Sequence, residues 1–169
     1  MYVPAEDTLF LLQYAKKYRG IWALEIGTGS GTIAQALIAN FRNVVATDID
    51  LGSLEYCRRK GGMMLVCCDA ASALYGKFDL VVTNPPYLPG NPEDDATVHG
   101  GPAGIETTMH FIESALPVLS DKGRILVVVS SLADMDTLDK FFQKKNLKKR
   151  VVGKKMLFYE HLYAVELTF

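Results

Sequence analysis

Short, nearly uninterrupted apolar runs alternate with segments of helical periodicity, and this alternation limits the possible folds more than any other feature. Residues 125–129 form the apolar run ILVVV, which is typical of a strand covered on both faces. Comparable strands are predicted at residues 21–26, 43–47, 63–68, 78–83 and 124–130, and helices at 6–19, 30–39, 51–60, 104–116 and 134–145. Repeated strand–helix units of this kind predict a parallel sheet with helices on both faces.

The end of the chain follows a different pattern. Apolar residues occupy every second position from Tyr163 to Phe169, which predicts two antiparallel strands after residue 145 rather than another strand–helix unit. The length of 169 residues is sufficient for one domain and short for two. We therefore expect residues 1–169 to form a single domain.

The composition argues against several classes of protein. No apolar run approaches the roughly 20 residues that a membrane span requires, and no charged-then-apolar leader is visible. We expect no membrane association and no signal peptide. The net charge of −1 lacks the basic excess of proteins that hold nucleic acid by themselves. One late stretch is nevertheless basic, with Lys144, Lys145, Lys148, Lys149, Arg150, Lys154 and Lys155.

The cysteines and histidines show no metal-binding pattern. Cys57, Cys67 and Cys68 lack paired metal-ligand spacing, and their odd number predicts reduced thiols in a cytoplasmic protein. The three histidines are scattered at positions 99, 110 and 161, and we interpret them as structural or surface residues. We expect no metal site.

The first predicted strand runs into a glycine-rich turn, Glu25-Ile26-Gly27-Thr28-Gly29-Ser30-Gly31. Glycine lets the backbone turn sharply and lets a ligand approach it closely, and the helix that follows presents free N–H groups. The spacing disfavours a pyrophosphate site, because the dinucleotide fingerprint needs a glycine where Thr32 stands. A tight turn without a ligand is the alternative interpretation.

Acidic residues stand at the ends of the first three predicted strands. Asp48 lies about 20 residues beyond the glycine turn, where sheets of this layout hold a ribose diol. Asp50 is a competing candidate, unless it only caps the next helix. Asp69, after the third strand, can accept a hydrogen bond from an adenine amino group or cap its own turn.

The glycine turn together with Asp48 and Asp69 resembles class I S-adenosylmethionine-dependent methyltransferases. The resemblance implies a Rossmann-like α/β fold, with a mostly parallel seven-stranded sheet, an antiparallel C-terminal hairpin and helices on both faces. It implies S-adenosylmethionine as the cofactor, with the glycine turn beside its methionine part, Asp48 on the ribose and Asp69 on the adenine. The cofactor-binding residues implied here are Glu25, Gly27, Gly29, Asp48, Ile49, Asp69 and Ala70, although Ala70 is small for a residue that flanks adenine.

The fourth predicted strand runs into Asn84-Pro85-Pro86-Tyr87, the most specific motif of the chain. An amide or aromatic amine is a poor nucleophile because its lone pair is delocalised, so an enzyme that methylates one must orient it. The Asn84 side-chain oxygen can accept one N–H of the amine, the Pro85 carbonyl can accept the other, and Tyr87 can stack on the flat acceptor. The prolines favour an extended backbone, which sets the direction of that carbonyl. A simple turn is the alternative interpretation.

This motif resembles that of the amino-methyltransferases, which methylate protein glutamine, adenine N6 or guanine N2. The stretches Tyr2-Val3-Pro4-Ala5-Glu6-Asp7-Thr8 and Gly100-Gly101-Pro102-Ala103-Gly104-Ile105-Glu106 resemble small HemK-type glutamine methyltransferases of eukaryotes and archaea. The resemblance implies that Asn84, Pro85 and Tyr87 are catalytic and that Thr8 and Asn84 also touch the cofactor. Bacterial HemK enzymes carry an N-terminal helical domain, for which we expect no room here.

Residues 84–103 contain five prolines with several glycines and acids, which predicts a loop without regular structure. We expect its part 87–103 to form the acceptor groove and to become ordered only when substrate binds. Glu93, Asp94 and Asp95 would then face a basic segment of the substrate.

The favoured function is methylation of a glutamine side chain in the GGQ loop of a class I translation release factor, and the near-neutral charge fits a protein substrate. The alternative is N-methylation of an exocyclic amine of adenine or guanine in RNA or DNA, which the basic stretch supports. A third hypothesis, a non-catalytic cofactor-binding subunit, is disfavoured by the intact motif at residues 84–87.

Residues 63–68 contain neither charge nor proline, and the resemblance places this strand at an edge of the sheet. Proteins normally protect such an edge with lysine, proline or a bulge. Flanking helices and a short loop can cover it, or a second chain can add a strand there. The resemblance implies a small zinc-binding activator subunit, and a homodimer through residues 63–68 is the other candidate partner.

Overall fold

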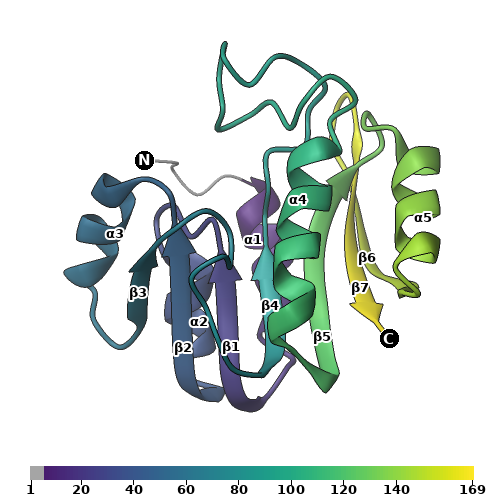
Figure 1. Ribbon diagram of the computed structural model, residues 1–169. Helices are drawn as coiled ribbons and strands as arrows, with labels where there is room; N and C mark the ends of the chain where they lie inside the picture. Colours follow the sequence, from purple (N-terminus) through teal and green to yellow (C-terminus); the bar gives the residue numbers. More distant parts are fainter. Residues whose placement is uncertain (1–5) are drawn as a thin grey trace.

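The computed structural model describes residues 6–169 and is built around one seven-stranded sheet (Figure 1). The strands are β1 Gly20–Ile26, β2 Phe41–Asp48, β3 Met64–Cys67, β4 Phe78–Thr83, β5 Leu119–Ser130, β6 Lys148–Met156 and β7 His161–Thr168. The helices are α1 Glu6–Ala15, α2 Thr32–Leu37, α3 Leu51–Arg58, α4 Glu106–Ala115, the short 3-10 helix η1 Leu116–Val118, and α5 Met135–Lys144.

The strand order is β3-β2-β1-β4-β5-β7-β6. Strands β1 to β5 pair in parallel, whereas β7 is antiparallel to both β5 and β6. The predicted fold class is therefore confirmed, including the antiparallel hairpin at the C-terminal end. The prediction that the third strand lies at an edge is confirmed as well.

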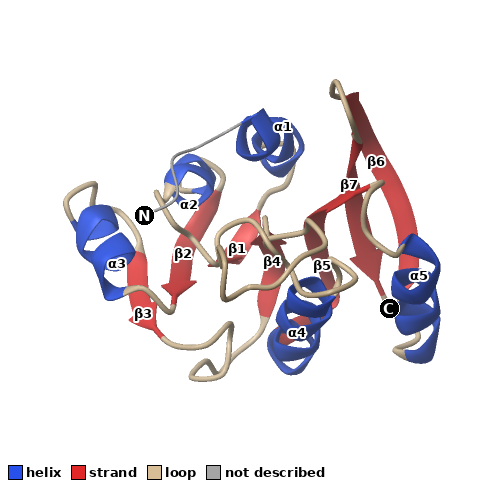
Figure 2. Cartoon of the chain, turned by 90° about the horizontal axis from the view of Figure 1, so that it is seen from above, coloured by secondary structure: helices blue, strands red, loops and turns tan. Residues whose placement is uncertain are grey.

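Strand β5 shows why the central strands read as uninterrupted apolar runs. Its residues Leu126 and Val128 belong to the buried cluster beneath α1 and α2, while Ile125, Val127 and Val129 belong to the cluster beneath α4 and α5. All five side chains are at most 1% exposed. Figure 2 shows α1 and α2 on one face of the sheet and α4 and α5 on the other. A strand between two helical layers has no polar face.

Most element boundaries lie within two residues of the expected ones, and two differ by more. Helix α1 ends at Ala15 rather than at residue 19, and β5 begins at Leu119 rather than at residue 124. The early part of β5 carries the polar sequence Ser-Asp-Lys-Gly at 120–123, so apolar periodicity cannot reveal it. Backbone pairing of Leu119 with Phe78, followed by a register shift, makes these residues part of the sheet.

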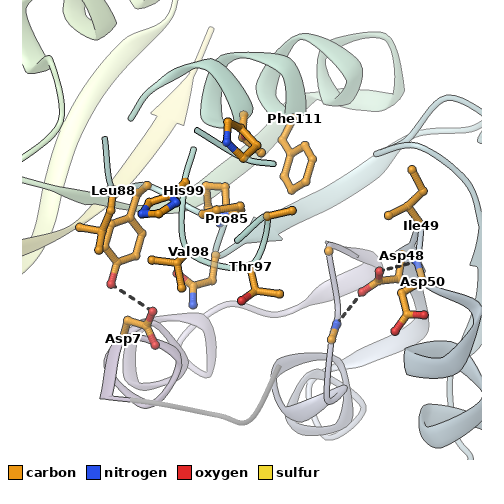
Figure 3. Close-up of a pocket in the computed structure, with 18 of the residues that line it drawn as sticks. Asp7, Asp48, Ile49, Asp50, Pro85, Leu88, Thr97, Val98, His99 and Phe111 are labelled. Atoms are coloured by element: carbon orange, nitrogen blue, oxygen red, sulfur yellow. Dashed lines mark hydrogen bonds between the residues drawn. The ribbon is translucent and has the colours of Figure 1, made fainter. Parts of the chain in front are cut away.

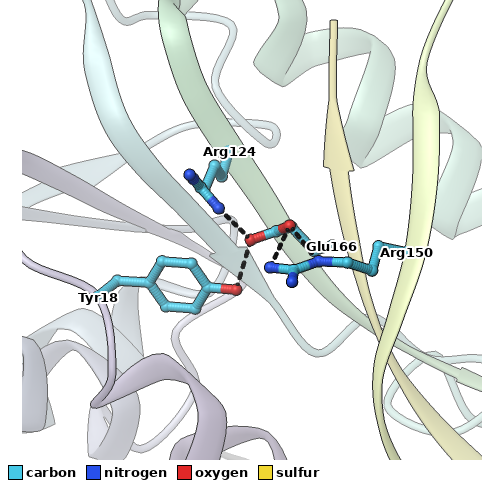
Figure 4. A network of polar contacts seen from close by, with 4 residues as sticks. All are labelled: Tyr18, Arg124, Arg150 and Glu166. Carbon is cyan, nitrogen blue, oxygen red and sulfur yellow. Dashed lines mark hydrogen bonds and ion pairs between the residues drawn. The ribbon is translucent and has the colours of Figure 1, made fainter.

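A buried carboxylate ties the C-terminal hairpin to the rest of the sheet (Figure 4). Glu166 of β7, 4% exposed, accepts hydrogen bonds from Tyr18 Oη and Arg124 Nη1, both at 2.8 Å, and from Arg150 Nε at 2.9 Å. Burial raises the pKa of Glu166, but the bonds from Arg124, Tyr18 and Arg150 outweigh it and hold the pKa below its usual range. The ionised carboxylate thus links β5, β6 and the end of α1.

Among residues 6–169, no helix is long and apolar enough to cross a membrane. The carboxyl ends of β1, β2, β3 and β4 all lie at one edge of the sheet, because these strands run parallel. The glycine turn, the acidic tips and the Asn84 motif follow those ends directly. The fold therefore brings the predicted site residues to a single edge.

Candidate active site

A cavity of about 870 Å³ opens at this edge. Its wall is formed by the turn after β1, the residues after β2 and β3, the Asn84 motif after β4, the loop at 92–99 and one side of α4. Figure 3 shows that the side chains at its two ends come from segments far apart in the sequence. Of the predicted site residues, the cavity wall contains Gly27, Gly29, Asp48, Ile49, Asp69, Ala70, Asn84, Pro85 and Tyr87.

The glycine turn needs glycine for its backbone conformation. Gly27 and Gly29 have φ angles of 69° and 50°, in the left-handed region that other residues rarely adopt. A Cβ atom on Gly27 would lie 3.2 Å from the ring of Phe111. The turn is anchored by the Thr28 N–H, which donates to the Thr47 carbonyl at 2.9 Å. The backbone at Gly27 and Gly29 is thus exposed to the cavity and held in one shape.

Glu25 lies behind this turn and outside the cavity wall. Its carboxylate is 4% exposed and accepts from Thr28 Oγ1 at 2.6 Å and from the Ala34 N–H at 2.8 Å. Burial raises the pKa of Glu25 to about 7, and the two hydrogen bonds only partly oppose the shift. Glu25 therefore braces the glycine turn against the start of α2.

This raised pKa predicts a pH-dependent stability. A carboxyl with a raised pKa in the folded state stabilises that state below its ordinary pKa of 4.5, and this contribution is lost as pH rises through about 7. The loss amounts to roughly 2 kcal/mol between about pH 5 and pH 8. Glu25→Gln keeps an oxygen for both hydrogen bonds and cannot titrate, so urea unfolding at several pH values should show a flatter profile. Identical profiles for both proteins would contradict the assignment.

The structure separates the roles of the two acids after β2. Asp48 accepts from the Gly29 N–H at 2.8 Å through Oδ2 and from the Asp50 N–H at 2.9 Å through Oδ1. Asp50 is the N-cap of α3, where it accepts from the backbone of Gly52 and Ser53. Each Asp48 oxygen retains a further lone pair. Asp48 can therefore still accept hydroxyl groups of a ligand in the cavity.

At the end of the cavity where adenine is expected, the structure places two residues that sequence reasoning missed, His110 and Phe111. Asp69 Oδ1 lies 2.7 Å from Nε2 of His110, a histidine that we interpreted as structural or surface. Phe111, the next residue, lies in the cavity wall under Gly27. Ile49 leaves 76% of its side chain exposed in this wall. Apolar surface beside a carboxylate is suited to a flat, amino-bearing ring.

Asn84 is oriented by a residue from the start of the chain. Its Nδ2 donates to Thr8 Oγ1 at 3.2 Å, which leaves Oδ1 as the free end of the amide. That oxygen is buried, and within residues 6–169 it has no hydrogen-bond partner. Thr8 is itself buried and outside the cavity wall, so it acts from behind Asn84. Residues 2–5 of the N-terminal stretch lie outside the described part of the chain.

Tyr87 is held at the same end of the cavity. Its hydroxyl donates to Asp7 Oδ2 at 3.1 Å (Figure 3). Pro85 and Pro86 lie between Asn84 and Tyr87 in the wall. The motif therefore presents a buried acceptor oxygen and an aromatic ring to one space.

The composition of residues 84–103 predicts a loop without regular structure, but the loop contains two isolated backbone bridges. Leu88 and His99 form one backbone bridge, and Gly90 and Gly101 form another, with the Gly90 N–H donating to the Gly101 carbonyl at 3.0 Å. Figure 1 shows the loop rising above the carboxyl edge of the sheet. The segments at 88–90 and 99–101 are thus joined by main-chain hydrogen bonds. Such bonds require no apolar side chains, so the amino-acid composition of the loop does not reveal them.

The donor and acceptor set fits S-adenosylmethionine. A carboxylate with free lone pairs, open glycine backbone and an apolar wall match a nucleoside with an amino-acid tail. The unpartnered Asn84 oxygen matches an N–H donor at the other end. Among the described residues, no group of three or more His, Cys, Asp or Glu is placed to hold a metal ion.

The known proteins that this chain matches in sequence are methyltransferases. Residues 6–157 match the family model described as "Methyltransferase small domain". A protein N5-glutamine methyltransferase of Methanocaldococcus jannaschii is 28% identical over 153 residues, covering 83% of this chain and 78% of that protein. A release factor glutamine methyltransferase of Bradyrhizobium diazoefficiens is 31% identical over 123 residues, covering 61% of this chain and 41% of that protein.

Solved structures agree with these matches. The E. cuniculi Mtq2-Trm112 complex, described as responsible for methylation of the eRF1 translation termination factor, aligns with a TM-score of 0.84. Its identity is 26%, and the alignment covers 99% of this chain and 97% of that one. A ribosomal protein L11 methylase of Lactobacillus delbrueckii, 16% identical with a TM-score of 0.71, shares the fold. The chain spans only 41% to 60% of the length of three bacterial release factor methyltransferases that it matches.

Proposed function

Because the chain belongs to the methyltransferase small domain family, we propose that it methylates the side-chain amide nitrogen of a glutamine in a translation release factor. The methyl donor is S-adenosylmethionine. The observation that carries the proposal is the Asn84 amide, which lies in the cavity wall and whose buried oxygen has no hydrogen-bond partner within residues 6–169. A buried acceptor left unpaired costs free energy, which a bound N–H recovers.

The protein has to orient the glutamine amide more than it has to activate either reactant. S-adenosylmethionine supplies the methyl group in an already activated form. Asn84 Oδ1 accepts one N–H of the glutamine amide and the Pro85 carbonyl accepts the other, which turns the nitrogen lone pair toward the methyl group. Thr8 fixes the Asn84 amide through the 3.2 Å bond, and Asp7 fixes the Tyr87 ring that lies against the acceptor.

The cofactor is held by residues of the opposite end. We assign the amino-acid part to the backbone of Gly27 and Gly29, the ribose to Asp48, and the adenine amino group to Asp69. Ile49 and Ala70 flank the ring, with Phe111 on the same wall. Glu25 and Thr8 support the site from outside the cavity by holding the glycine turn and Asn84.

The ion pairs made by the basic stretch at 144–155 favour a release factor over nucleic acid as the substrate. Lys145 pairs with Glu113 at 2.5 Å, Lys149 with Asp139 at 2.5 Å, and Lys155 with Glu6 at 2.9 Å, and Arg150 is held by Glu166. These pairs offset four of the seven cations of the stretch, which weakens it as a phosphate-binding surface, while Lys144, Lys148 and Lys154 stay exposed. The relatives named as release factor methyltransferases support the same substrate class.

The direct test offers both classes of acceptor to one preparation. The protein is incubated with methyl-labelled S-adenosylmethionine and either a class I release factor, the same factor with its acceptor glutamine replaced by alanine, bulk tRNA or duplex DNA. We expect label only in the first sample. Label in tRNA or DNA would instead establish the alternative function.

The acids of the loop provide a second discrimination. Glu93, Asp94 and Asp95 are exposed, and we expect them to attract a basic segment of a protein substrate. Reversing all three to lysine should raise the KM for the release factor by about tenfold and leave kcat nearly unchanged. Reversal of the three exposed acids Glu55, Asp121 and Asp136, which lie outside the cavity wall, is the matched control. A lower KM in the loop variant would favour a nucleic acid acceptor.

The open edge of β3 supports a protein partner. Met64 is 44% exposed and Cys67 is exposed, and among the described strands only β2 pairs with β3. The opposite edge, β6, carries several lysines, which protect an edge from pairing. We propose that a small activator subunit, zinc-binding as the family resemblance implies, adds to this edge. A homodimer through residues 63–68 is the other outcome.

Met64→Lys should abolish this association. Leu65 and Val66 pack on the core, whereas the exposed Met64 side chain can be charged without disturbing the fold. Association is measured by light scattering of the protein alone and with a small subunit of the kind present in the E. cuniculi complex. Val151→Lys, at a 50% exposed position on β6, is the matched control. A wild-type protein that stays monomeric and ignores the subunit would disprove the proposal.

A further inference from the structure

We propose that Phe158 and Tyr159, at the tip of the β6–β7 hairpin, form a docking knob for the protein substrate beside the acceptor end of the cavity. This inference rests on the proposed function and extends it to a second contact, outside the cavity.

The docking knob is almost wholly exposed. Phe158 is 90% exposed and Tyr159 is 84% exposed, and their ring centroids lie 4.7 Å apart in an edge-to-face contact. Met156, next to them, is 74% exposed. Single exposed apolar residues are ordinary, but adjacent aromatic rings within a polar rim indicate an interaction site. Phenylalanine and tyrosine also supply large contact areas at low cost in side-chain entropy.

The segment that carries the knob is held in place on both sides. The Leu157 N–H donates to the Glu160 carbonyl at 2.8 Å and closes the turn. The Glu160 carboxylate accepts from the Ser130 hydroxyl, and the His161 N–H donates to Ser131 Oγ at 2.9 Å. These bonds fasten the tip to the end of β5. A rigid knob loses little freedom on binding, which favours affinity.

The position of the tip connects it to the acceptor end of the cavity. Leu157, immediately before Phe158, is part of the cavity wall together with Glu6 and Tyr87. Lys155 of the same hairpin pairs with Glu6 at 2.9 Å. Figure 2 shows the hairpin tip projecting beyond the body of the sheet, on the side of α1. A protein that places one side chain in the cavity would meet the knob with a neighbouring surface.

The charges around the cavity favour a protein over a nucleic acid as the occupant. Asp7 lies in the wall beside Glu6, which pairs with Lys155, and the exposed Glu93, Asp94 and Asp95 lie on the loop. Carboxylates repel phosphate groups, so aromatic stacking on bases would have to occur in an unfavourable field. An apolar and basic surface of a folded protein matches both the aromatic rings and the acids.

The experiment compares a large and a small acceptor. The Phe158→Ala/Tyr159→Ala double variant should raise the KM for the intact release factor by about tenfold or more, with kcat within about twofold. Methylation of a short peptide that contains the acceptor glutamine, and calorimetric affinity for S-adenosylmethionine, should be unchanged. Tyr75→Ala is the matched control, because Tyr75 is 96% exposed and outside the cavity wall. Tyr159→Phe should retain most of the affinity.

The outcomes are distinguishable. An unchanged KM for the release factor in the double variant would overturn the docking knob and leave the proposed function standing. An equal loss for the peptide and the intact factor would also overturn it, because the residues would then act within the cavity. If the wild-type protein neither binds nor methylates the release factor, the proposed function fails and the docking knob fails with it.

Discussion

Replacing Asn84 with alanine should lower methyl transfer by about 100-fold or more while the affinity for S-adenosylmethionine stays nearly unchanged. The variant removes the buried oxygen that would accept an N–H of the glutamine amide, and within residues 6–169 no other side chain pairs with that oxygen. An amide that is free to rotate presents its lone pair to the methyl group only rarely. The loss therefore falls on the transfer step and not on cofactor binding.

Single-turnover transfer of labelled methyl groups and calorimetric titration with S-adenosylmethionine measure the two effects separately. Thr8→Val is the informative companion variant, because it keeps the Asn84 oxygen and removes the 3.2 Å bond that orients the amide, together with the 3.4 Å bond from Thr8 Oγ1 to Asp7. We expect an intermediate loss of rate for it. Turnover within a few-fold of wild type in Asn84→Ala would rule out the orientation mechanism.

Asp48→Ala should weaken binding of S-adenosylmethionine by about 2–4 kcal/mol, or roughly 30- to 1,000-fold in Kd. The alanine variant loses the carboxylate that would accept the ribose hydroxyl groups. It also loses the acceptor that holds the Gly29 N–H at 2.8 Å and the Asp50 N–H at 2.9 Å, so the glycine turn becomes less well positioned. Both losses act in the same direction on cofactor affinity.

Calorimetry at one pH measures this change, with circular dichroism to show that the fold is retained. Asp50→Ala is the matched control, because Asp50 also lies in the cavity wall but uses its carboxylate to cap α3. We expect it to lower the free energy of unfolding by about 1 kcal/mol with little effect on cofactor affinity. Unchanged affinity in Asp48→Ala would show that this carboxylate is structural.

The local pattern of the sequence was sufficient for the layout of the site. Apolar runs without a polar face indicated central parallel strands, and the carboxyl ends of parallel strands lie at one edge of their sheet. The glycine turn, Asp48, Asp69 and Asn84 each follow such an end. Their convergence around one cavity could therefore be predicted before any contact between them was known.

Contacts between distant segments were beyond the same reasoning. His110 meets Asp69 across 41 positions, and Tyr87 meets Asp7 across 80. Nothing in either local sequence encodes such a contact, because it depends on how α4 and α1 pack on opposite faces of the sheet. For this reason the sequence alone does not distinguish His110 from a surface residue and gives no signal for Phe111 under Gly27.

By itself, the sequence determined the order of strands and helices, the antiparallel end and the residues at the strand tips, since these follow from periodicity and turn chemistry within short windows. The tertiary structure alone decided that Asp48 holds the Gly29 N–H while Asp50 caps a helix, although both lie in the cavity wall. It also decided that Glu25 has a raised pKa and that the Asn84 oxygen is buried, with no hydrogen-bond partner among residues 6–169. Burial and hydrogen bonding depend on which segments come together in space, and these properties control the chemistry of a carboxylate or an amide.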